Sequence, residues 1–416
     1  MTITRIVLVT IILLFINSND CFPQKIVEKY NISYPNMNIS CTRLKQNSKN
    51  DEVYLFVFFT EPGKNCKLIV YNSQFKIVFQ KENILNEISE TDIFENEECF
   101  YFKGNKQIYK LNTSTFILDS IKTNRIYKNL IAHTIKGSEV LVADHLNGFD
   151  LFSLPELKIK EEINVGGIAD ISIPRVYNDI IYYNTKKNLL SAYDFKKHKV
   201  IWNFDGGESK VKFMGIKVGS MPNTIKRYKI YSNKYLLVNS FGGDLYKLDL
   251  ESGNILYSKK KFRGDDNNAG LLRSLTFIDI NKDGSNEIIA PSVDHNIYCI
   301  TENDFSILWS YDTDDENQTP VSSYDVNHDQ IPDILSVNDK LKLSIINGKD
   351  GRLLNEVKLQ TENSFGQSSI ILSDFNHNNL LDLFVIGRDN NGSTQLKFLE
   401  FNNVYAKERI VWEPEE

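Results

Sequence analysis

Three acidic loops at near-equal spacing constrain the fold of this chain more than any other feature. They begin at Asp279, Asp325 and Asp374, so consecutive loops start 46 and 49 residues apart. Each loop follows a short apolar run and leads into another, as a turn between two β-strands does. Oxygen-bearing side chains stand at positions 1, 3, 5 and 9 of each loop, and position 7 offers its main-chain carbonyl. This pattern suits Ca²⁺, which takes about six to eight oxygen ligands.

The predicted ligands follow the same positions in all three loops, with Ser285, Ile331 and Leu380 contributing main-chain oxygens. They are Asp279, Asn281, Asp283, Ser285 and Glu287; Asp325, Asn327, Asp329, Ile331 and Asp333; and Asp374, Asn376, Asn378, Leu380 and Asp382. The first two loops offer three carboxylates each. The third offers only two, because Asn378 replaces the acid at position 5. We therefore expect two calcium sites and a weaker third site.

The loops are not EF-hands. An EF-hand needs flanking helices and a bidentate Glu at position 12. Position 12 is occupied by Ala290, Ser336 and Val385, and the flanking runs are rich in β-branched residues. A second interpretation stays open, in which the loops are turns that bind nothing, because Asp, Asn and Gly favour turns in any case. The recurrence of three loops at one period favours calcium.

In these residues the chain resembles the FG-GAP repeat, which is integrin-α-like and also called VCBS. The Asp-x-Asn-x-Asp-Gly-x-x-Asp loop of that repeat binds calcium between strands of a β-propeller blade. The match covers about residues 270–400. Gln330 and Asn379 stand where the repeat has Gly. The resemblance implies a β-propeller in which calcium is structural.

A strand–turn–strand unit recurs through the whole chain, with unit starts separated by 40 to 55 residues. The paired strands are predicted at 52–59 with 67–71, 98–102 with 107–111, 139–143 with 149–154, 179–183 with 189–193, 234–239 with 244–248, 287–290 with 296–300, 333–337 with 342–346, and 382–386 with 395–401. A further run precedes each acidic loop, and another follows a polar turn, which gives four short strands per unit. Four-stranded units of this length are propeller blades.

The sequence therefore predicts an all-β fold, a β-propeller of four-stranded antiparallel blades, with eight blades favoured over seven. A β-sandwich beside a smaller propeller is the other alternative. Closing such a fold takes one strand from each end of the chain. Residues 25–34 or 37–44 are expected to supply the N-terminal strand, and residues 408–412 are expected to end the chain beside it.

A second resemblance is to the PQQ-like propeller repeat. It is carried by residues 243–253 and by the aromatic strand ends at Trp202 and Trp309, within about residues 180–310. A quinoprotein dehydrogenase is not expected, because such an enzyme is much longer and has a Trp-rich docking pattern. The chain has only three tryptophans, the third being Trp412.

The N-terminus predicts export. Residues 1–18 resemble a secretory signal peptide, with Arg5 before an apolar run, 6–16, that is too short to span a membrane. Residues 19–416 are then predicted to form a single β-propeller domain that is secreted or lies in the cell envelope, in the periplasm or at the cell surface. Its net charge of −6 argues against nucleic acid as a partner, and no basic stripe is expected.

The five cysteines suit an oxidising compartment only in part, because their number is odd. Cys21 with Cys41 and Cys66 with Cys99 are possible disulfides, which leaves Cys299 as a thiol.

No catalytic motif is present: Gly-x-Ser-x-Gly, His-Glu-x-x-His and Walker-type loops are all absent from the sequence. The fold-level analogy favours a protein- or glycan-binding module used for adhesion or as a scaffold. The integrin-like resemblance implies surface recognition, and the PQQ-like resemblance implies scaffolding in envelope assembly. The alternative is a calcium-dependent carbohydrate-active enzyme of the polysaccharide-lyase type. It would need a Lys, Arg or Tyr base, and the sequence nominates no catalytic residue.

Overall fold

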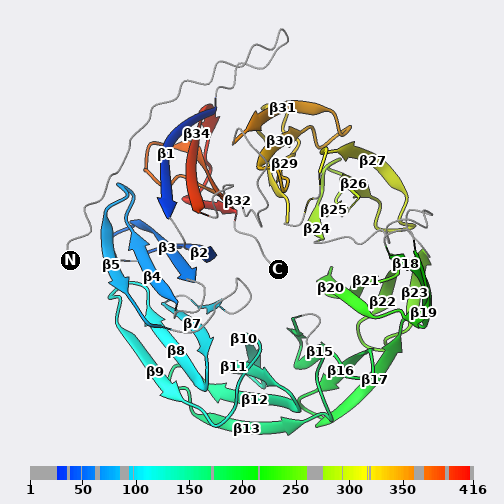
Figure 1. Ribbon diagram of the computed structural model, residues 1–416. Coiled ribbons are helices and arrows are strands. Elements are labelled where there is room, and N and C mark those ends of the chain that lie inside the picture. Colours follow the sequence, from blue (N-terminus) through cyan, green and yellow to red (C-terminus); the bar gives the residue numbers. More distant parts are fainter. Residues whose placement is uncertain are drawn as a thin grey trace. The chain divides into compact units, whose positions relative to one another are not determined.

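The described part of the molecule is built from β-strands. The computed structural model describes residues 26–34, 38–47, 49–60, 66–84, 93–96, 98–169, 173–213, 216–259, 275–292, 294–315, 317, 320–359, 370–388 and 393–412 (Figure 1). None of these residues lies in a helix. The same residues therefore include no helix with the length and hydropathy needed to cross a membrane. The predicted signal peptide and Cys21 lie outside the described residues.

The strands form eight antiparallel blades, which we number 1 to 8 in chain order. Seven are four-stranded sheets, and the eighth has four strands with a fifth added at one edge. The fold is an eight-bladed β-propeller. Both the eight blades and the antiparallel four-stranded sheets predicted from the sequence are confirmed. The seven-bladed and sandwich alternatives are wrong. Every strand pair predicted from the repeat is the second and third strand of a blade.

By compactness the chain divides into two units, which we describe separately. The first unit comprises residues 1–84, 273–302 and 306–416. It contains blade 1, β2 (Asn38–Gln46), β3 (Val53–Thr60), β4 (Lys67–Tyr71) and β5 (Ile77–Lys81); blade 6, β24 (Thr276–Ile278), β25 (Glu287–Pro291), β26 (Asn296–Ile300) and β27 (Ile307–Asp312); blade 7, β28 (Ser322–Tyr324), β29 (Asp333–Val337), β30 (Lys342–Ile346) and β31 (Leu353–Lys358); and blade 8.

The second unit comprises residues 85–272 and 303–305. It contains blade 2, β6 (Ile93–Glu95), β7 (Cys99–Gly104), β8 (Gln107–Asn112) and β9 (Leu118–Lys122); blade 3, β10 (Leu130–Ile135), β11 (Ser138–His145), β12 (Gly148–Ser153) and β13 (Ile159–Asn164); blade 4, β14 (Arg175–Tyr177), β15 (Ile180–Asn184), β16 (Leu189–Asp194) and β17 (Lys199–Asp205); and blade 5, β20 (Ile225–Tyr231), β21 (Tyr235–Ser240), β22 (Leu245–Asp249) and β23 (Ile255–Lys259). A separate hairpin, β18 (Glu208–Phe213) and β19 (Ile216–Pro222), lies between blades 4 and 5 in the sequence.

Blade 8 combines strands from both ends of the chain. Its order is β1 (Ile26–Tyr34), β34 (Thr394–Tyr405), β33 (Leu380–Arg388) and β32 (Ile370–Ser373), and β35 (Ile410–Trp412) is added beyond β32. The first of the two predicted N-terminal strands is therefore the closing one, and the second is β2 of blade 1. The prediction that residues 408–412 lie beside the N-terminal strand is wrong. Because β1 occupies the free edge of β34, the C-terminal strand pairs at the opposite edge of the sheet.

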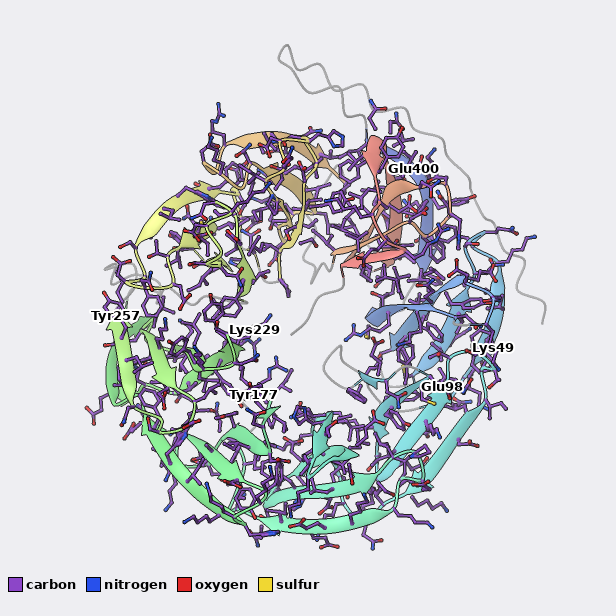
Figure 2. All side chains as sticks on the ribbon, turned by 180° about the vertical axis from the view of Figure 1, so that it is seen from behind. Lys49, Glu98, Tyr177, Lys229, Tyr257 and Glu400 are labelled. Carbon is purple, nitrogen blue, oxygen red and sulfur yellow. The ribbon has the colours of Figure 1, made fainter. Side chains whose placement is uncertain are left out.

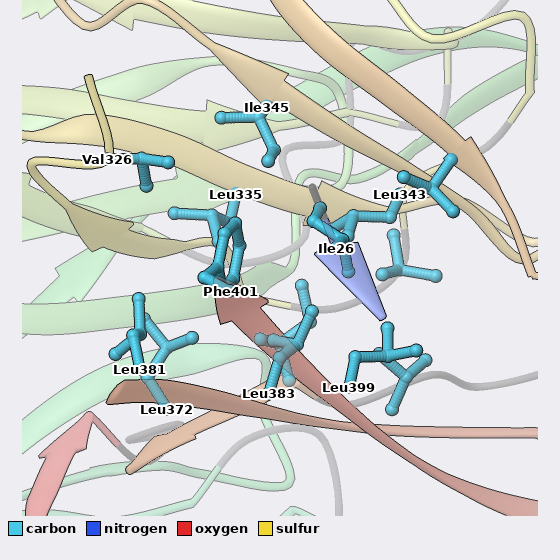
Figure 3. Close-up of a cluster of buried hydrophobic side chains, with 14 of the residues drawn as sticks. Ile26, Val326, Leu335, Leu343, Ile345, Leu372, Leu381, Leu383, Leu399 and Phe401 are labelled. Carbon is cyan, nitrogen blue, oxygen red and sulfur yellow. The ribbon is translucent and has the colours of Figure 1, made fainter. Parts of the chain in front are cut away.

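The second strand of a blade is buried on both faces. In β3, β25 and β29 almost every residue is buried, whereas all five residues of the outermost strand of blade 5, β23, are exposed or only partly buried. The buried side chains gather between successive blades. One cluster joins blades 7 and 8 through Leu335, Leu343, Leu383 and Phe401 (Figure 3). Continuous apolar runs are therefore found where both faces of a strand are covered.

Two tryptophans join successive blades within their units. The indole N–H of Trp309 on β27 donates to the carbonyl of Gly348 at 2.8 Å in blade 7. The indole N–H of Trp202 on β17 donates to the carbonyl of Leu250 at 3.0 Å in blade 5. Each ring lies against a glycine in the last turn of the next blade, Gly351 (φ +74°) and Gly253 (φ +69°) respectively. These are the aromatic strand ends that the sequence singled out.

The four cysteines among the described residues, Cys41, Cys66, Cys99 and Cys299, are buried thiols. The disulfide between Cys66 and Cys99, one of the pairings left open by the sequence, is not formed. Cys299 is a thiol, as expected, and its burial raises its pKa.

The contact between Gly351 and Trp309 predicts a large effect of a single methyl group. A Cβ at Gly351 would lie 2.9 Å from the Trp309 ring, whereas one at Gly137, which has the same φ of +74°, would meet nothing within 4 Å. We expect Gly137→Ala to lower the free energy of unfolding by about 1–2 kcal/mol through left-handed backbone strain alone. Gly351→Ala should lose about 1–3 kcal/mol more through overpacking. Denaturant unfolding of both variants measures the difference, and equal losses would contradict the docking role of the indole.

Candidate metal centres

The three acidic loops occupy one position in three consecutive blades. Each connects the first strand of its blade to the second: β24 to β25, β28 to β29, and β32 to β33. The strand registers match as well, because the residue before each loop pairs with the acid at position 9. These pairs are Ile278 with Glu287, Tyr324 with Asp333, and Ser373 with Asp382. The sequence repeat therefore corresponds to a structural repeat.

The loops also share one pattern of internal hydrogen bonds. The acid at position 9 accepts the backbone N–H of position 2, at 3.1 Å from Ile280, 3.0 Å from Val326 and 2.8 Å from Phe375. The side chain at position 1 accepts the N–H of position 6, at 3.0 Å from Gly284, 3.0 Å from Gln330 and 3.2 Å from Asn379. Side-chain oxygens at positions 3 and 5 bind the N–H groups of positions 5 and 7 in the same way. The carboxylates thereby turn towards the inside of each loop.

The two departures from the FG-GAP pattern do not change this geometry. Position 6 has positive φ in all three loops: 86° at Gly284, 70° at Gln330 and 66° at Asn379. Glycine reaches this conformation at no steric cost, whereas Gln330 and Asn379 adopt it with some strain. The loops therefore keep their shape without the glycine.

Burial places the position-9 carboxyls where a negative charge is costly. Asp333 and Asp382 have no exposed surface. Burial, together with the charges of Asp329 and Asp325, raises the pKa of Asp333 to about 7. Burial, together with Glu400 and Asp374, raises the pKa of Asp382 to about 8. The pKa of Glu287 is also raised by burial and by its loop acids. A bound cation would stabilise all three carboxylates in their charged form.

The donor set fits calcium better than it fits a transition metal. Among the described residues, no three His, Cys, Asp or Glu side chains come together as a metal-binding group. A cation in these loops would therefore also need Asn and main-chain oxygens, which calcium accepts and softer metals do not favour. One buried carboxylate oxygen of Asp325 and one of Asp382 have no hydrogen-bond partner. Such an oxygen, inside a loop of acceptors, is what a hard cation would ligate.

The third loop differs in residues that the sequence analysis missed. Glu400, which is labelled in Figure 2, belongs to β34. It pairs with Asp382 of β33 in the strand register, so the loop faces a third carboxylate. The side-chain amides of Asn376 and Asn378 donate to Glu400 at 2.9 Å and 2.5 Å. Lys29 pairs with Glu400 at 2.8 Å, and Arg409 pairs with Asp374. The only sequence signal for Glu400 is its register opposite Asp382, which needs the strand pairing to be known.

A second polar cluster in blade 3 bears on the enzyme alternative. The Tyr127 hydroxyl donates to Asp150 at 2.5 Å, Arg125 pairs with the same carboxylate, and His145 Nε2 lies 3.5 Å from it. Tyr127 is buried, and burial followed by its bond to Asp150 raises its pKa far above the usual range. A tyrosine that acts as a base must ionise near the working pH. The cluster links residues 125–127 to Asp150 of β12, and the raised pKa does not favour Tyr127 as a base.

Comparison with known proteins supports the fold. No protein-family model matches the sequence, and no curated protein does. Among solved structures the chain is similar to BamB from Moraxella catarrhalis, with a TM-score of 0.54 and 10% sequence identity over 89% of this chain and 99% of that one. It is also similar to the computationally designed Ika8 protein, with a TM-score of 0.52 and 9% identity over 87% of this chain and 96% of that one. At such identities the likeness shows the fold alone. The FG-GAP assignment of the loops stays a prediction.

The raised pKa values predict how the metal-free protein responds to pH. An aspartate in the unfolded chain has a pKa of about 3.9, below the values of about 7 and about 8 for Asp333 and Asp382 in the folded state. The folded state then binds more protons, so its free energy of unfolding falls as pH rises through this interval, by at most about 1.4 kcal/mol per pH unit for each carboxyl. Denaturant unfolding in chelator at pH 5.5 and pH 8 measures this fall.

Two variants test whether Asp382 causes part of this pH dependence of the free energy of unfolding. Asp382→Asn should flatten part of the pH dependence, and Asp119→Asn, at an exposed carboxyl, should leave it unchanged. Stability that rises with pH in chelator would contradict the assignment.

Proposed function

We propose that the chain is an exported, calcium-braced β-propeller that binds a partner protein through an acidic surface of that partner. The proposal rests on one observation, a basic segment in the second unit. Residues 209–243 contain seven Lys or Arg and no Asp or Glu, although the whole chain has a net charge of −6. These basic residues are Lys210, Lys212, Lys217, Lys226, Arg227, Lys229 and Lys234. Such a concentration of one sign favours an oppositely charged partner.

Three of the basic residues belong to β20, the edge strand of blade 5. Arg227 is exposed, and Lys229 lies on the same side of the second unit as Tyr177, away from Tyr257 on the outermost strand (Figure 2). The Lys226 ammonium lies 5.1 Å from the centre of the Phe241 ring. Burial, and then the neighbouring Arg227, lower the pKa of Lys226. An acidic ligand would relieve this crowding of positive charge.

The base of the β18–β19 hairpin is held by buried hydrogen bonds. The Asn223 side-chain amide donates to Asp244 at 2.9 Å, and the Asn223 backbone N–H donates to Gly207 at 2.7 Å. The Tyr246 hydroxyl donates to the same Asp244 at 3.0 Å. This network fixes the backbone just before β20. A surface presented on a fixed backbone loses less entropy on binding, which favours a recognition role.

Calcium has a bracing role in this proposal. Each acidic loop contains or faces three carboxylates, and within the described residues the first two loops form no ion pair with Lys or Arg, unlike the third. The resemblance to the FG-GAP repeat and the orphaned oxygen of Asp325 support a cation there. A metal that binds the folded loop but not the unfolded chain stabilises the fold by mass action. The loops are on blades 6 and 7 of the first unit, and the basic segment belongs to the second unit. The proposal gives calcium no contact with the partner.

Calcium should raise the thermal stability of the mature protein. With free calcium about a hundredfold above the dissociation constant, each site adds about 2.7 kcal/mol to the free energy of unfolding. We expect a midpoint several degrees higher than in chelator, and magnesium should not reproduce it because it gives up its water reluctantly. Glu287→Gln and Asp333→Asn should each reduce the shift. An unchanged midpoint with calcium would contradict the bracing role and leave the loops as turns.

Charge reversal on β20 should abolish binding to an acidic ligand. We expect Arg227→Glu with Lys229→Glu to weaken binding to immobilised poly-L-glutamate by at least about tenfold at low salt. The matched control is Lys158→Glu with Lys160→Glu, at exposed lysines of blade 3, and it should retain binding. Polygalacturonate serves as the second probe. Selective binding of polygalacturonate would indicate a glycan-binding module instead, and equal behaviour of the two double variants would refute the β20 surface.

A further inference from the structure

The three loops carry equal numbers of acids but differ in the cations around them. Loop 1 has Asp279, Asp283 and Glu287, and loop 2 has Asp325, Asp329 and Asp333. Loop 3 has Asp374, Asp382 and, from β34, Glu400. Among the described residues, only loop 3 has Lys or Arg side chains within ion-pair distance of its acids. The sequence indicated fewer acids in the third loop. In the folded protein the third loop differs instead in its neighbouring Lys and Arg side chains.

We propose that loop 3 takes its cation from the chain itself: the Arg409 guanidinium, assisted by Lys29, occupies the role that calcium has in loops 1 and 2. The inference rests in part on the calcium role proposed above. It goes beyond that role by assigning an internal cation to the third site.

Arg409 is attached to Asp374 twice. Its guanidinium Nη1 pairs with the carboxylate Oδ2, and its main-chain carbonyl accepts the Asp374 N–H at 2.9 Å. The Asp374 side chain has only 4% of its surface exposed, and that of Arg409 has 28%. A guanidinium held at both its backbone and its side chain loses little freedom when it pairs. This geometry places a fixed positive charge on the first ligand of the loop.

The position-3 Asn side chain of loop 3 has a different hydrogen-bond acceptor from those of loops 1 and 2. In loops 1 and 2 the Asn at position 3 donates into its own loop, from Asn281 to Glu287 at 3.0 Å and from Asn327 to Asp329 at 3.0 Å. In loop 3 the corresponding Asn376 donates to Glu400 on β34. Glu400 in turn pairs with Lys29 of β1. Burial alone would raise the pKa of Glu400, but the bonds from Lys29, Asn376 and Asn378 lower it below its ordinary value.

The source of both cations explains why only loop 3 has them. Lys29 comes from β1 and Arg409 directly precedes β35, and these two strands pair only with strands of blade 8. Blades 6 and 7 receive no strand from a chain end. Loop 3 retains an unpartnered buried oxygen on Asp382 together with Asn and main-chain oxygens. Removing Arg409 should therefore convert the loop into a metal site.

The test measures calcium bound per chain, by dialysis and elemental analysis of the mature full-length protein. We expect two ions in the native protein and three in Arg409→Gln. Arg352→Gln, which removes an exposed arginine that pairs with Asp350, is the matched control and should keep two. Asp382→Asn should keep two ions in the native background and reduce three to two in the Arg409→Gln background. Three ions in the native protein, or no additional ion in Arg409→Gln, would overturn the inference.

The same experiment separates this inference from the proposed bracing role. If the native protein binds no calcium, the bracing role fails, yet a gain of one ion in Arg409→Gln would still support the internal cation. A second measurement needs no metal: in chelator, a double-mutant cycle of Arg409→Gln and Asp374→Asn should give a favourable coupling. Zero coupling would refute the pairing. If Arg409→Gln unfolds in chelator, its recovery by calcium supports the inference, and no recovery refutes it.

Discussion

The structure depends on a contact that one blade makes with the last turn of the next. In that turn one residue adopts a left-handed conformation, and a side chain from the outermost strand of the preceding blade packs against it. Trp202 meets Gly253 and Trp309 meets Gly351 in this way. Tyr257 packs on Phe305, whose φ is 52°, with ring centres 5.3 Å apart in the second unit.

In blade 3 the corresponding contact is polar. His198 Nδ1 lies 3.0 Å from the Glu161 carboxylate of β13, and His198 is the left-handed residue of the turn that precedes β17. A four-stranded sheet has two faces to cover, and stacking successive blades covers both. The contacting side chains differ in chemistry, but each reaches the same backbone feature. Blade-to-blade packing therefore needs the turn geometry more than it needs tryptophan, and only two of these described contacts use one.

The sequence predicted the second and third strands of all eight blades because these strands are covered on both faces and are therefore continuous apolar runs. It did not place the first strands of blades 2 to 5. Two of these, β6 and β14, have only three residues each, which is too few for a periodic signal. The β18–β19 hairpin was missed for another reason: it interrupts the repeat, and its lysine-rich strands lack the apolar run that marks a blade. The basic character of residues 209–243 can be seen in the sequence, but the sequence analysis considered only the net charge of the whole chain, which is negative.

The acidic loops have some features that neighbouring residues determine and others that depend on distant strands. Their turn chemistry and their place between two strands follow from neighbouring residues, so the sequence placed the loops correctly. Their role as calcium ligands stays a prediction. Whether a loop needs a metal depends on the charges that approach from elsewhere. Glu400 reaches loop 3 only because β33 pairs with β34, Lys29 because β1 pairs with β34, and Arg409 because β35 pairs with β32. No local sequence pattern predicts that Glu400, Lys29 and Arg409 lie close to loop 3.

The three loops have equal numbers of acidic side chains, and the proposals above balance their negative charge in two ways: by a bound cation or by Lys and Arg side chains of the protein. Carboxylates in a partly buried turn are costly unless positive charge is near. Blades 6 and 7 are each made from one continuous segment, and among the described residues no Lys or Arg pairs with the acids of their loops. The calcium proposed above would supply that positive charge. Blade 8 is completed by both chain ends, which bring Lys29 and Arg409 to its loop. The same two ion pairs also attach β1 and the segment before β35 to blade 8, so the neutralisation of loop 3 and the completion of the blade depend on the same residues.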